Sequence, residues 1–459
     1  MTERPSEWDA HPGNPYSWPD RAKWAVMATA LLVTLLVGLN ATSITTAGDR
    51  LTADFRLGGS SSLLETNFFA VTAWSAAAAL VPLVTLPLMD TYGVRRGYLA
   101  CYVLFTVLLI PQALAPNFAT LVGCRAVAGA AAGTLQNAAD GIAANLWPDP
   151  RARVLPLTGY VFCLVFGVTM GPVLGAVCEP LNWRWIFWLQ LILCGASFPI
   201  VYIFLKETRG SVVRRRCCPE DDEEPRGNGA LQELRAATTR SAVLLTTEPA
   251  VALFTLWSSF AFGLVFLSTQ SIPLVFGSAF GWPAYRSGLV QSAIGLGQVL
   301  GFGACLLQRT IYIRSAQRND EDPGVPVPEA ILHLSIPTTP VALAGGLFMY
   351  GWSIYQPHWI VAAVGLVLVG FASMVIVNSA SIYITDSYST FAASAIAAVA
   401  FGENFFAAFL PLAAKPMYER LGYDWASSLL GFVGLALTAA PVLLFCNGNK
   451  IRRTSTFKE

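Results

Sequence analysis

Long apolar runs separated by short polar gaps repeat about twelve times along the chain. The first of them, from Trp24 to Ala47, contains no ionisable side chain. A helix needs about 20 consecutive apolar residues to cross the hydrocarbon of a bilayer, and shorter or more charged runs are typical of helices in soluble domains. Each run is therefore predicted to be a membrane-spanning helix.

Breaks in the apolar pattern place the predicted helices in two sets of six. The spans are 24–47, 67–89, 97–116, 118–146, 154–178, 185–205, 250–275, 287–307, 334–355, 358–384, 392–413 and 425–446. This pattern predicts an all-α membrane protein with a tail at 1–23, six-helix bundles at 24–205 and 250–446, a linker at 206–249 and a second tail at 447–459.

The positive charges predict which side each loop faces. With both termini in the cytoplasm, 22 of the 29 Lys and Arg residues lie inside and 6 outside, and Arg125 falls within a span. Positive residues concentrate in cytoplasmic loops, so both tails and the linker are predicted to be cytoplasmic. The linker combines Arg214-Arg215-Arg216, acidic residues 220–224 and Gly227-Asn228-Gly229, which is typical of a mobile tether.

Composition excludes several classes of function. The chain is 54% hydrophobic and 12% charged, against about 25% charged residues in soluble domains, and its net charge of +1 gives no reason to expect a nucleic-acid partner. Three dispersed histidines and nine scattered cysteines suggest no metal site, cofactor site or catalytic nucleophile. Cys217-Cys218 beside the arginines is a weak candidate for palmitoylation. No cleaved signal peptide is expected at the start of the chain.

Arg125 is the costliest residue in the predicted spans, since arginine in the hydrocarbon costs at least ~2.5–3.5 kcal/mol. It begins a stripe that repeats every fourth residue and so lies along one helix face: Arg125, Gly129, Gly133, Asn137 and Gly141. Another backbone or a ligand can approach such a stripe closely. Arg125 then faces a polar cavity or partner, or alternatively snorkels to the outer interface.

Two carboxylates within the spans are the candidate proton carriers. Asp140 follows Gln136 and Asn137 in the fourth span. It lies roughly 22 Å beyond Arg125 along the helix, at 1.5 Å per residue, so the two cannot pair. Glu403 lies in mid-span in the eleventh run. Intramembrane acids serve most often as functional groups, although Asp140 alternatively meets water near the inner mouth.

Further polar and small residues suggest cavity lining and helix packing. Asn40 and Asn378 are predicted to line a cavity or to bridge helices, and Asp386 at the inner end of its span is expected to be solvated. In the fifth span, Gly159, Cys163, Gly167, Gly171 and Gly175 repeat at steps of four around Pro172. We expect this stripe to pack closely or hinge. Gly297 and Gly301 are expected to offer a matching surface across the two halves.

Several motifs, in order, resemble those of one family. The turn from Pro87 to Arg96, the stretch Leu121–Gly129 around Arg125, and the stretch Gly167–Ala176 are similar to the inner-loop, fourth-helix and fifth-helix motifs of the major facilitator superfamily. Shorter stretches resemble landmarks of its fungal drug:proton antiporters: Asn14–Trp18, Asn182–Phe187, Lys206–Arg209, Pro328-Glu329 and Tyr383–Tyr388. The resemblance covers nearly the whole chain.

The resemblance implies roles for individual residues. Asp90, Arg95 and Arg96 would form the charge contacts of an inner gate, and Gly93 would allow the tight reversal between helices. Arg125 would take part in proton coupling. The stretch around Gly167, Gly171, Pro172 and Gly175 would correspond to the helix motif that is linked with antiport.

The expected protein is a monomeric transporter of two facing six-helix bundles around a central cavity, which alternates access by rocking. It would export a small amphipathic organic compound in exchange for protons, across the plasma membrane or alternatively the vacuolar membrane. Proton-coupled uptake and a transporter-like sensor are the rival interpretations. Candidate pocket aromatics, each of which alternatively packs or faces lipid, are Phe69, Trp74, Phe262, Phe266, Trp352 and Phe371.

Overall fold

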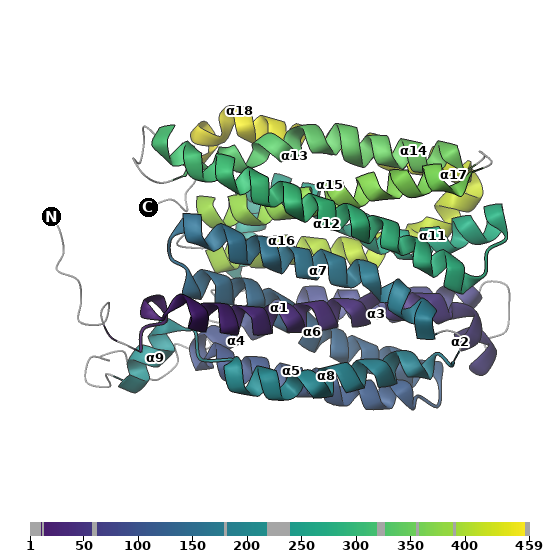
Figure 1. Cartoon of the computed structure of the whole chain (residues 1–459), viewed down its shortest axis with the longest axis horizontal. Helices are drawn as coiled ribbons and strands as arrows, with labels where there is room; N and C mark the ends of the chain where they lie inside the picture. Colours follow the sequence, from purple (N-terminus) through teal and green to yellow (C-terminus); the bar gives the residue numbers. More distant parts are fainter. Residues whose placement is uncertain are drawn as a thin grey trace.

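The computed structural model describes residues 11, 13–56, 62–178, 181–217, 239–318, 326–354, 358–388 and 392–454. These residues form long helices that lie side by side, and no strand occurs among them (Figure 1). The predicted acidic stretch 220–224, Gly227-Asn228-Gly229 and Cys218 lie outside the described residues. The ends of the predicted tails, 1–10 and 455–459, also lie outside them.

The first half of the chain supplies the lower helices of Figure 1. They are α1 (Asp20–Thr42) with the short helix η2 (Ser43–Ala47), α2 (Gly48–Asp54), α3 (Ser62–Leu80), α4 (Pro82–Tyr92), α5 (Val94–Ala113), α6 (Phe118–Leu146), α7 (Pro150–Cys178), α8 (Arg184–Phe204) and α9 (Gly210–Cys217). Local chemistry sets the ends. The side chain of Asn117, for example, caps α6 by accepting a hydrogen bond from the backbone N–H of Thr120 at 2.8 Å.

The second predicted span is broken rather than continuous. Residues 69–80 of α3 and α4 together form one span that bends by 44° at Val81. Val81 keeps helical φ and ψ of -67° and -37°, but Pro82 lacks a backbone N–H and its ring clashes with the carbonyl of the residue four positions before it. The bend therefore has a covalent cause that an apolar pattern does not report.

The second half of the chain supplies the upper helices of Figure 1. They are α11 (Pro249–Phe280), α12 (Ala284–Ser315), η5 (Pro328–Ile331), α13 (Leu332–Thr338), the π-helix η6 (Thr339–Ala344), α14 (Gly345–Ser353), α15 (Trp359–Ser387), α16 (Ala392–Phe409), η8 (Leu410–Ala413), α17 (Ala414–Leu437) and α18 (Ala439–Thr454). Pro337 and Pro340 flank the switch from α to π geometry, since each removes a hydrogen-bond donor from the helix.

One helix runs much further than its apolar pattern predicted. The eighth span was expected to end near residue 307, whereas α12 continues to Ser315. Its last turns carry buried polar side chains that find partners: Gln308 donates a hydrogen bond to the carbonyl of Ala330 at 2.6 Å, and Tyr312 donates one to Asp386. Hydrogen bonds to other helices thus permit polar residues to extend a buried helix.

The described helices account for twelve spans. Ten stretches are long and apolar enough to cross a membrane, and the bent α3–α4 pair makes eleven. One of the ten, Ala392–Gly448, has 57 residues, which is about 85 Å of helix at 1.5 Å per residue and twice what a bilayer needs. It reverses at Gly422, whose φ of 79° favours glycine. This stretch therefore holds the last two spans.

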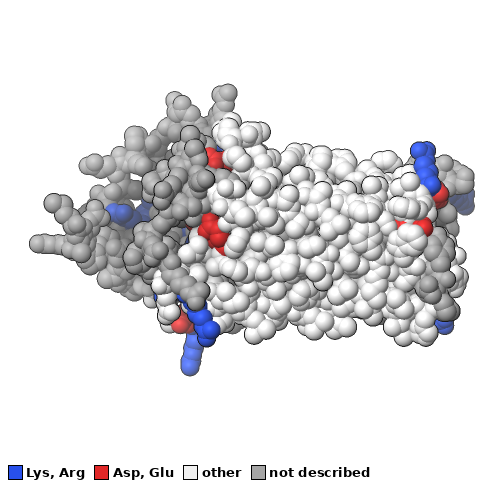
Figure 2. Space-filling model, turned by 90° about the horizontal axis from the view of Figure 1, so that it is seen from above, with Lys and Arg blue, Asp and Glu red and all other residues white. Residues whose placement is uncertain are grey.

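The twelve spans form two bundles that face each other. Helices α1, α3, α5, α6, α7 and α8 pack together, as do α11, α12 and α14–α17, and the bundles meet where α7 packs on α12 and α3 packs on α16. The first residues of α1, the end of α18 and α9 lie at the same end of the molecule, on the left in Figure 1. The space-filling view shows a broad white band between charges gathered at the two ends (Figure 2), as a bilayer requires.

Candidate functional site

The two candidate proton carriers come together although they belong to opposite bundles. Asp140 of α6 and Glu403 of α16 line one cavity at the interface between the bundles. The remaining lining residues come from α6, α7, α15 and α16: Asn137, Tyr160, Val161, Leu164, Val377, Ser381, Ile384, Ile396, Val399 and Ala400. No basic side chain is among these residues. The cavity is thus a small acidic site in apolar surroundings.

Each carboxylate is almost completely buried. Asp140 is 1% exposed and Glu403 is 8% exposed. Ser258 of α11 donates a hydrogen bond to Oε1 of Glu403, whereas Oδ1 of Asp140 has no hydrogen-bond partner among the described residues. Tyr160 of α7 lines the same cavity as both acids. A buried acceptor without a donor is costly, so Asp140 has a reason to bind a proton or a ligand group.

The cavity is closed in this conformation. Its volume is about 20 Å³, which is room for about one water molecule, whereas sites for organic ligands occupy roughly 300–1,000 Å³. A substrate of that size therefore requires the bundles to separate at this interface.

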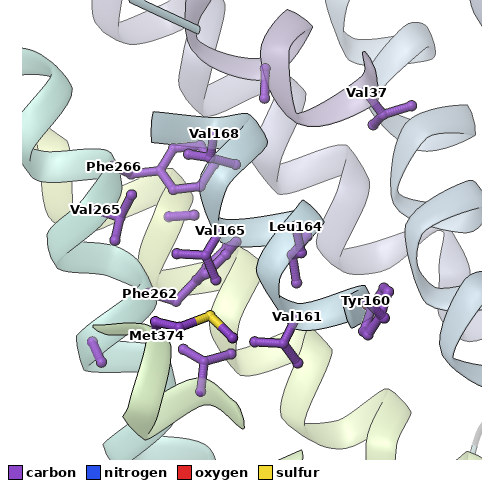
Figure 3. Close-up of a cluster of buried hydrophobic side chains, with 14 of the residues drawn as sticks. Val37, Tyr160, Val161, Leu164, Val165, Val168, Phe262, Val265, Phe266 and Met374 are labelled. Carbon is purple, nitrogen blue, oxygen red and sulfur yellow. The ribbon is translucent and has the colours of Figure 1, made fainter. Parts of the chain in front are cut away.

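Apolar side chains continue from the cavity along the interface. Val161, Leu164, Val165 and Val168 of α7 meet residues of the other bundle, as Figure 3 shows. These partners are Phe262, Val265 and Phe266 of α11 and Met374 of α15. Of the candidate pocket aromatics, Phe262 and Phe266 thus lie between the bundles. Phe69 and Trp352 are about half exposed on the outside, and Trp74 packs within the first bundle.

Arg125 is placed away from the acidic cavity, in the interior of the first bundle. It is 0% exposed, so it does not snorkel to the interface. Its guanidinium donates hydrogen bonds to the carbonyls of Ala70 at 2.9 Å and Ala41 at 2.7 Å, and more weakly to that of Asn40 at 3.4 Å. It also lies over the ring of Trp74, 5.0 Å from its centroid. Backbone carbonyls and an aromatic face therefore hold this charge between α1, α3 and α6.

The predicted polar residues divide between the cavity and helix bridges. Asn137 lines the cavity, while Gln136 is buried beside it without being among the lining residues. The side chain of Asn40 donates a hydrogen bond to Gln190 of α8, which in turn donates one to Ser43 at 3.0 Å. Asn40 thus bridges helices, which was one of its two predicted roles.

The predicted inner-gate residues make contacts with the first bundle and with the start of the linker. Asp90 forms an ion pair with Arg209 at 3.5 Å, and Nη2 of Arg95 donates a hydrogen bond to the carbonyl of Tyr202 at 3.2 Å. Gly93 makes the reversal between α4 and α5 with a φ of 108°, a conformation that favours glycine. Arg96 is exposed. A gate role for these four residues remains a prediction.

An ion pair that the sequence did not predict joins the bundles at the same end. Arg153 of α7 and Asp386 of α15 lie 2.8 Å apart, with side chains 10% and 5% exposed, and Tyr312 of α12 donates a hydrogen bond to Asp386. The prediction that Asp386 is solvated is therefore wrong, because these two partners replace water. Arg153 also acts electrostatically on Asp140. The one indication of this contact in the sequence is the group of polar residues near the end of α12, which includes Tyr312.

The glycine stripe of α7 packs against α1, as close-packing stripes do. A Cβ on Gly167 would lie 2.8 Å from the carbonyl oxygen of Leu35, and one on Gly38 would lie 3.0 Å from the backbone of Gly167. Gly171 and Gly175 approach η2 and the end of α1 in the same way. Pro172 lies in the same stretch of α7 and contacts α12 through its carbonyl, which would meet a Cβ on Gly288 at 3.2 Å.

The expectation for Gly297 and Gly301 is wrong. Both pack against α15 inside the second bundle, where Cβ atoms would meet the backbone at Val367 and Phe371. Gly288 and Gly295 of α12 face α7 instead, next to Pro172 and Met170. All four glycines lie on one helix, and only its rotation about its axis decides which pair faces the partner bundle.

Metal-binding geometry is not found in the part of the chain that the structure describes. No group of three or more His, Cys, Asp or Glu side chains lies close enough there to hold an ion.

Comparisons with known proteins agree with this architecture. Residues 30–317 match the family model of the Major Facilitator Superfamily. The MFS transporter cpaT of Aspergillus oryzae is 32% identical, with 100% of this chain and 94% of that protein covered. The efflux pump radE of Floropilus chiversii is 30% identical, with 98% of this chain and 85% of that protein covered.

Solved structures share the fold at low sequence identity. The proton:xylose symporter XylE superposes with a TM-score of 0.67 and 15% identity, over 94% of this chain and 96% of the other. The human organic anion transporter MFSD10 (TETRAN) gives a TM-score of 0.62 and 17% identity, over 91% and 99%. The twelve spans in two bundles, the family match and the relatives together show that this chain is a membrane transporter that belongs to the Major Facilitator Superfamily, alongside fungal members.

Proposed function

We propose that this transporter exports a small amphipathic organic compound in exchange for protons. The observation that carries the proposal is the pair of buried acids, Asp140 and Glu403, which face one cavity from opposite bundles. The name of a relative, the efflux pump radE, supports the direction of transport. The apolar interface beside the cavity supports an amphipathic cargo.

Proton binding would change the preference between facing states. Two ionised carboxylates in a closed apolar cavity repel each other, and the repulsion is strong where water is excluded. Protonation of either Asp140 or Glu403 would remove it and favour the closed interface. Loss of the proton would favour separation of the bundles, and a ligand then shifts the equilibrium by its difference in affinity for the two states.

Other residues would support this cycle. Arg153 forms an ion pair with Asp386 and is close enough to Asp140 for their charges to interact. It would therefore connect proton binding at Asp140 to closure of the bundles at this end. Asp90, Gly93, Arg95 and Arg96 would keep the first bundle rigid there. Arg125 would act by fixing how the helices of the first bundle pack, because its hydrogen-bond partners are backbone carbonyls of α1 and α3.

We infer further that the end bearing α9 faces the cytoplasm, because 22 of 29 Lys and Arg residues then lie inside. The proposed domains keep their predicted boundaries: bundles at 24–205 and 250–446, a linker at 206–249, and tails at 1–23 and 447–459. The transporter would act as a monomer in the plasma membrane, or alternatively in the vacuolar membrane, with no cofactor.

The test uses purified protein in vesicles with an imposed pH gradient. The cargo is first identified as a toxic compound to which a deletion strain is hypersensitive. Accumulation on the proton-rich side supports export, whereas accumulation on the opposite side indicates proton-coupled uptake. Retained binding without counterflow would mark a sensor.

Substitutions then test the two acids. Asp140→Asn and Glu403→Gln should each abolish gradient-driven accumulation while exchange of labelled for unlabelled cargo continues, because exchange needs no net proton movement. Glu419→Gln, at a side chain that is 57% exposed, is the matched control and should transport normally. Unchanged response to the gradient in both acid variants would remove them from the coupling.

A further inference from the structure

We infer that the groove between α5 and α8 binds one anionic phospholipid, with its acyl chain in the groove and its phosphate at Arg95. The two helices form one edge of the molecule, at the bottom of Figure 1. The groove lies on this edge and is separate from the interface between the bundles. It is an open groove with a volume of about 620 Å³, so one side of a chain bound in it stays in contact with the surrounding bilayer.

The walls of the groove suit a hydrocarbon chain. Leu99, Ala100, Val103 and Val107 of α5 form one wall, and Phe198 and Tyr202 of α8 form the other. Val103, Val107 and Tyr202 are 43%, 53% and 57% exposed, so the groove opens toward the surrounding lipid. The side chain of Ala100 is small, so it leaves the groove open at this position.

The length of the groove matches one leaflet. From Arg95 to Val107 the helix rises roughly 18 Å at 1.5 Å per residue, and half of a bilayer's hydrocarbon is about 15 Å. Arg95 lies in the first turn of α5, at the end of the molecule that bears α9, and one turn before Leu99. A chain that fills the groove therefore brings its headgroup to the level of Arg95.

Charge at this end favours an anionic headgroup. The guanidinium of Arg95 lies 5.9 Å from the centroid of the Tyr202 ring and donates one hydrogen bond through Nη2, while its Nε is buried without a partner among the described residues. The acids nearby are already engaged: Asp90 pairs with Arg209, and Glu207 accepts hydrogen bonds from the backbone of Val94 and Arg95. No described carboxylate thus pairs with the side chain of Arg95, which is partly exposed and so remains available to a phosphate through its terminal nitrogens.

Lipid retention tests the inference directly. The full-length protein is equilibrated with equal amounts of phosphatidylserine and phosphatidylcholine that carry identical acyl chains, washed with lipid-free detergent, and examined by native mass spectrometry. We expect one retained phosphatidylserine per chain. Equal retention of the two lipids by the wild type would overturn the inference.

Variants separate the groove from the headgroup site. Ala100→Trp should fill the groove and remove the retained lipid, whereas Ile192→Trp, at a 59% exposed position of α8 outside the groove, should keep it. Val107→Trp repeats the test at the deep end if Ala100→Trp fails to fold. Retention by the folded groove variants equal to that of the control would contradict the inference.

Arg95→Gln should lower the preference for phosphatidylserine about five-fold, since one basic residue near a membrane surface contributes about that factor. Arg420→Gln, at an exposed arginine near the opposite end of the molecule, should leave the preference unchanged. An unchanged preference in Arg95→Gln would place the headgroup elsewhere. Because the measurement is lipid binding, its outcome does not depend on the proposed transport.

Discussion

Arg153 and Asp386, 233 residues apart, form a buried ion pair of 2.8 Å that joins the two bundles at the end of the molecule where α9 lies. Tyr312 donates a hydrogen bond to the same carboxylate. Removing one partner of a buried pair leaves an uncompensated charge and costs about 3–5 kcal/mol. The pair is therefore well placed to hold this side closed.

Asp386→Asn should open the transporter on this side. A cost of about 3 kcal/mol, if it falls on the closed state alone, shifts the equilibrium more than about 100-fold. The measurement is the rate at which a membrane-impermeant thiol reagent labels a cysteine introduced at Ser381, which lines the closed cavity. The rate should rise strongly in Asp386→Asn and stay unchanged in Glu419→Gln, whose ion pair with Lys415 is exposed. Equal labelling rates without either substitution, with Asp386→Asn and with Glu419→Gln would show that the Arg153–Asp386 pair does not hold this side closed.

Gly167→Ala should destabilise the protein, because the added methyl group would lie 2.8 Å from the carbonyl oxygen of Leu35. Overpacking of this kind typically costs about 1–3 kcal/mol. Gly159→Ala in the same helix is the matched control, since its methyl group would meet only a Leu31 side-chain carbon at 3.5 Å. Thermal unfolding in detergent should show a lower midpoint for Gly167→Ala and no loss for Gly159→Ala. Similar midpoints for the two would mean that α1 and α7 pack less closely.

Glu207→Ala should loosen the start of α5. Its carboxylate accepts hydrogen bonds from the backbone N–H groups of Val94 at 3.0 Å and Arg95 at 3.1 Å, and so caps this helix from 112 or 113 residues away. Loss of such a cap typically costs about 0.5–2 kcal/mol. Hydrogen exchange at Val94 and Arg95 should accelerate in Glu207→Ala and less in Glu207→Gln, which keeps one acceptor oxygen. Unchanged exchange in Glu207→Ala would contradict the capping role.

Arg125→Lys should destabilise the first bundle although it keeps the charge. The guanidinium reaches carbonyls of α1 and α3 at once, and an ammonium lacks that planar fork of donors. A buried carbonyl left without its donor costs about 1–3 kcal/mol, which thermal unfolding would detect. If Arg125→Lys unfolds normally and yet loses coupling to the pH gradient, the residue acts on the protons instead of on the packing.

Much of the fold could be predicted from the sequence, because lipid makes strong demands on single helices. The apolar runs gave α6 its bounds at 118–146, and they gave α15 and α8 to within three residues. The predictions were wrong where contacts with other helices allow polar residues that a single helix in lipid would exclude. The end of α12 is polar, so the apolar pattern predicts a helix that ends too early. In the structure, its polar side chains form hydrogen bonds with Ala330 and Asp386.

The candidate site was predictable by residue but not by arrangement. Asp140 and Glu403 stood out separately, since each interrupts an apolar run, yet nothing in the sequence indicates that they share a cavity. The position of Asp386 at a helix end predicts a solvated carboxylate, whereas in the structure Arg153 and Tyr312 lie beside it. Gly297 and Gly301 were assigned to the wrong interface, because helical periodicity defines a face without naming its neighbour.

The amino-acid sequence by itself determined that the chain threads a membrane twelve times, which parts carry positive charge, and which few residues are too polar for lipid without a reason. These properties are local, because each helix must satisfy its own backbone and expose its own apolar surface to the bilayer. Only the tertiary structure decided the pairing of Arg153 with Asp386, the meeting of Asp140 with Glu403, and the retention of Arg125 by carbonyls. Such contacts depend on the relative rotation and depth of helices far apart in the chain, which are set by packing between whole bundles.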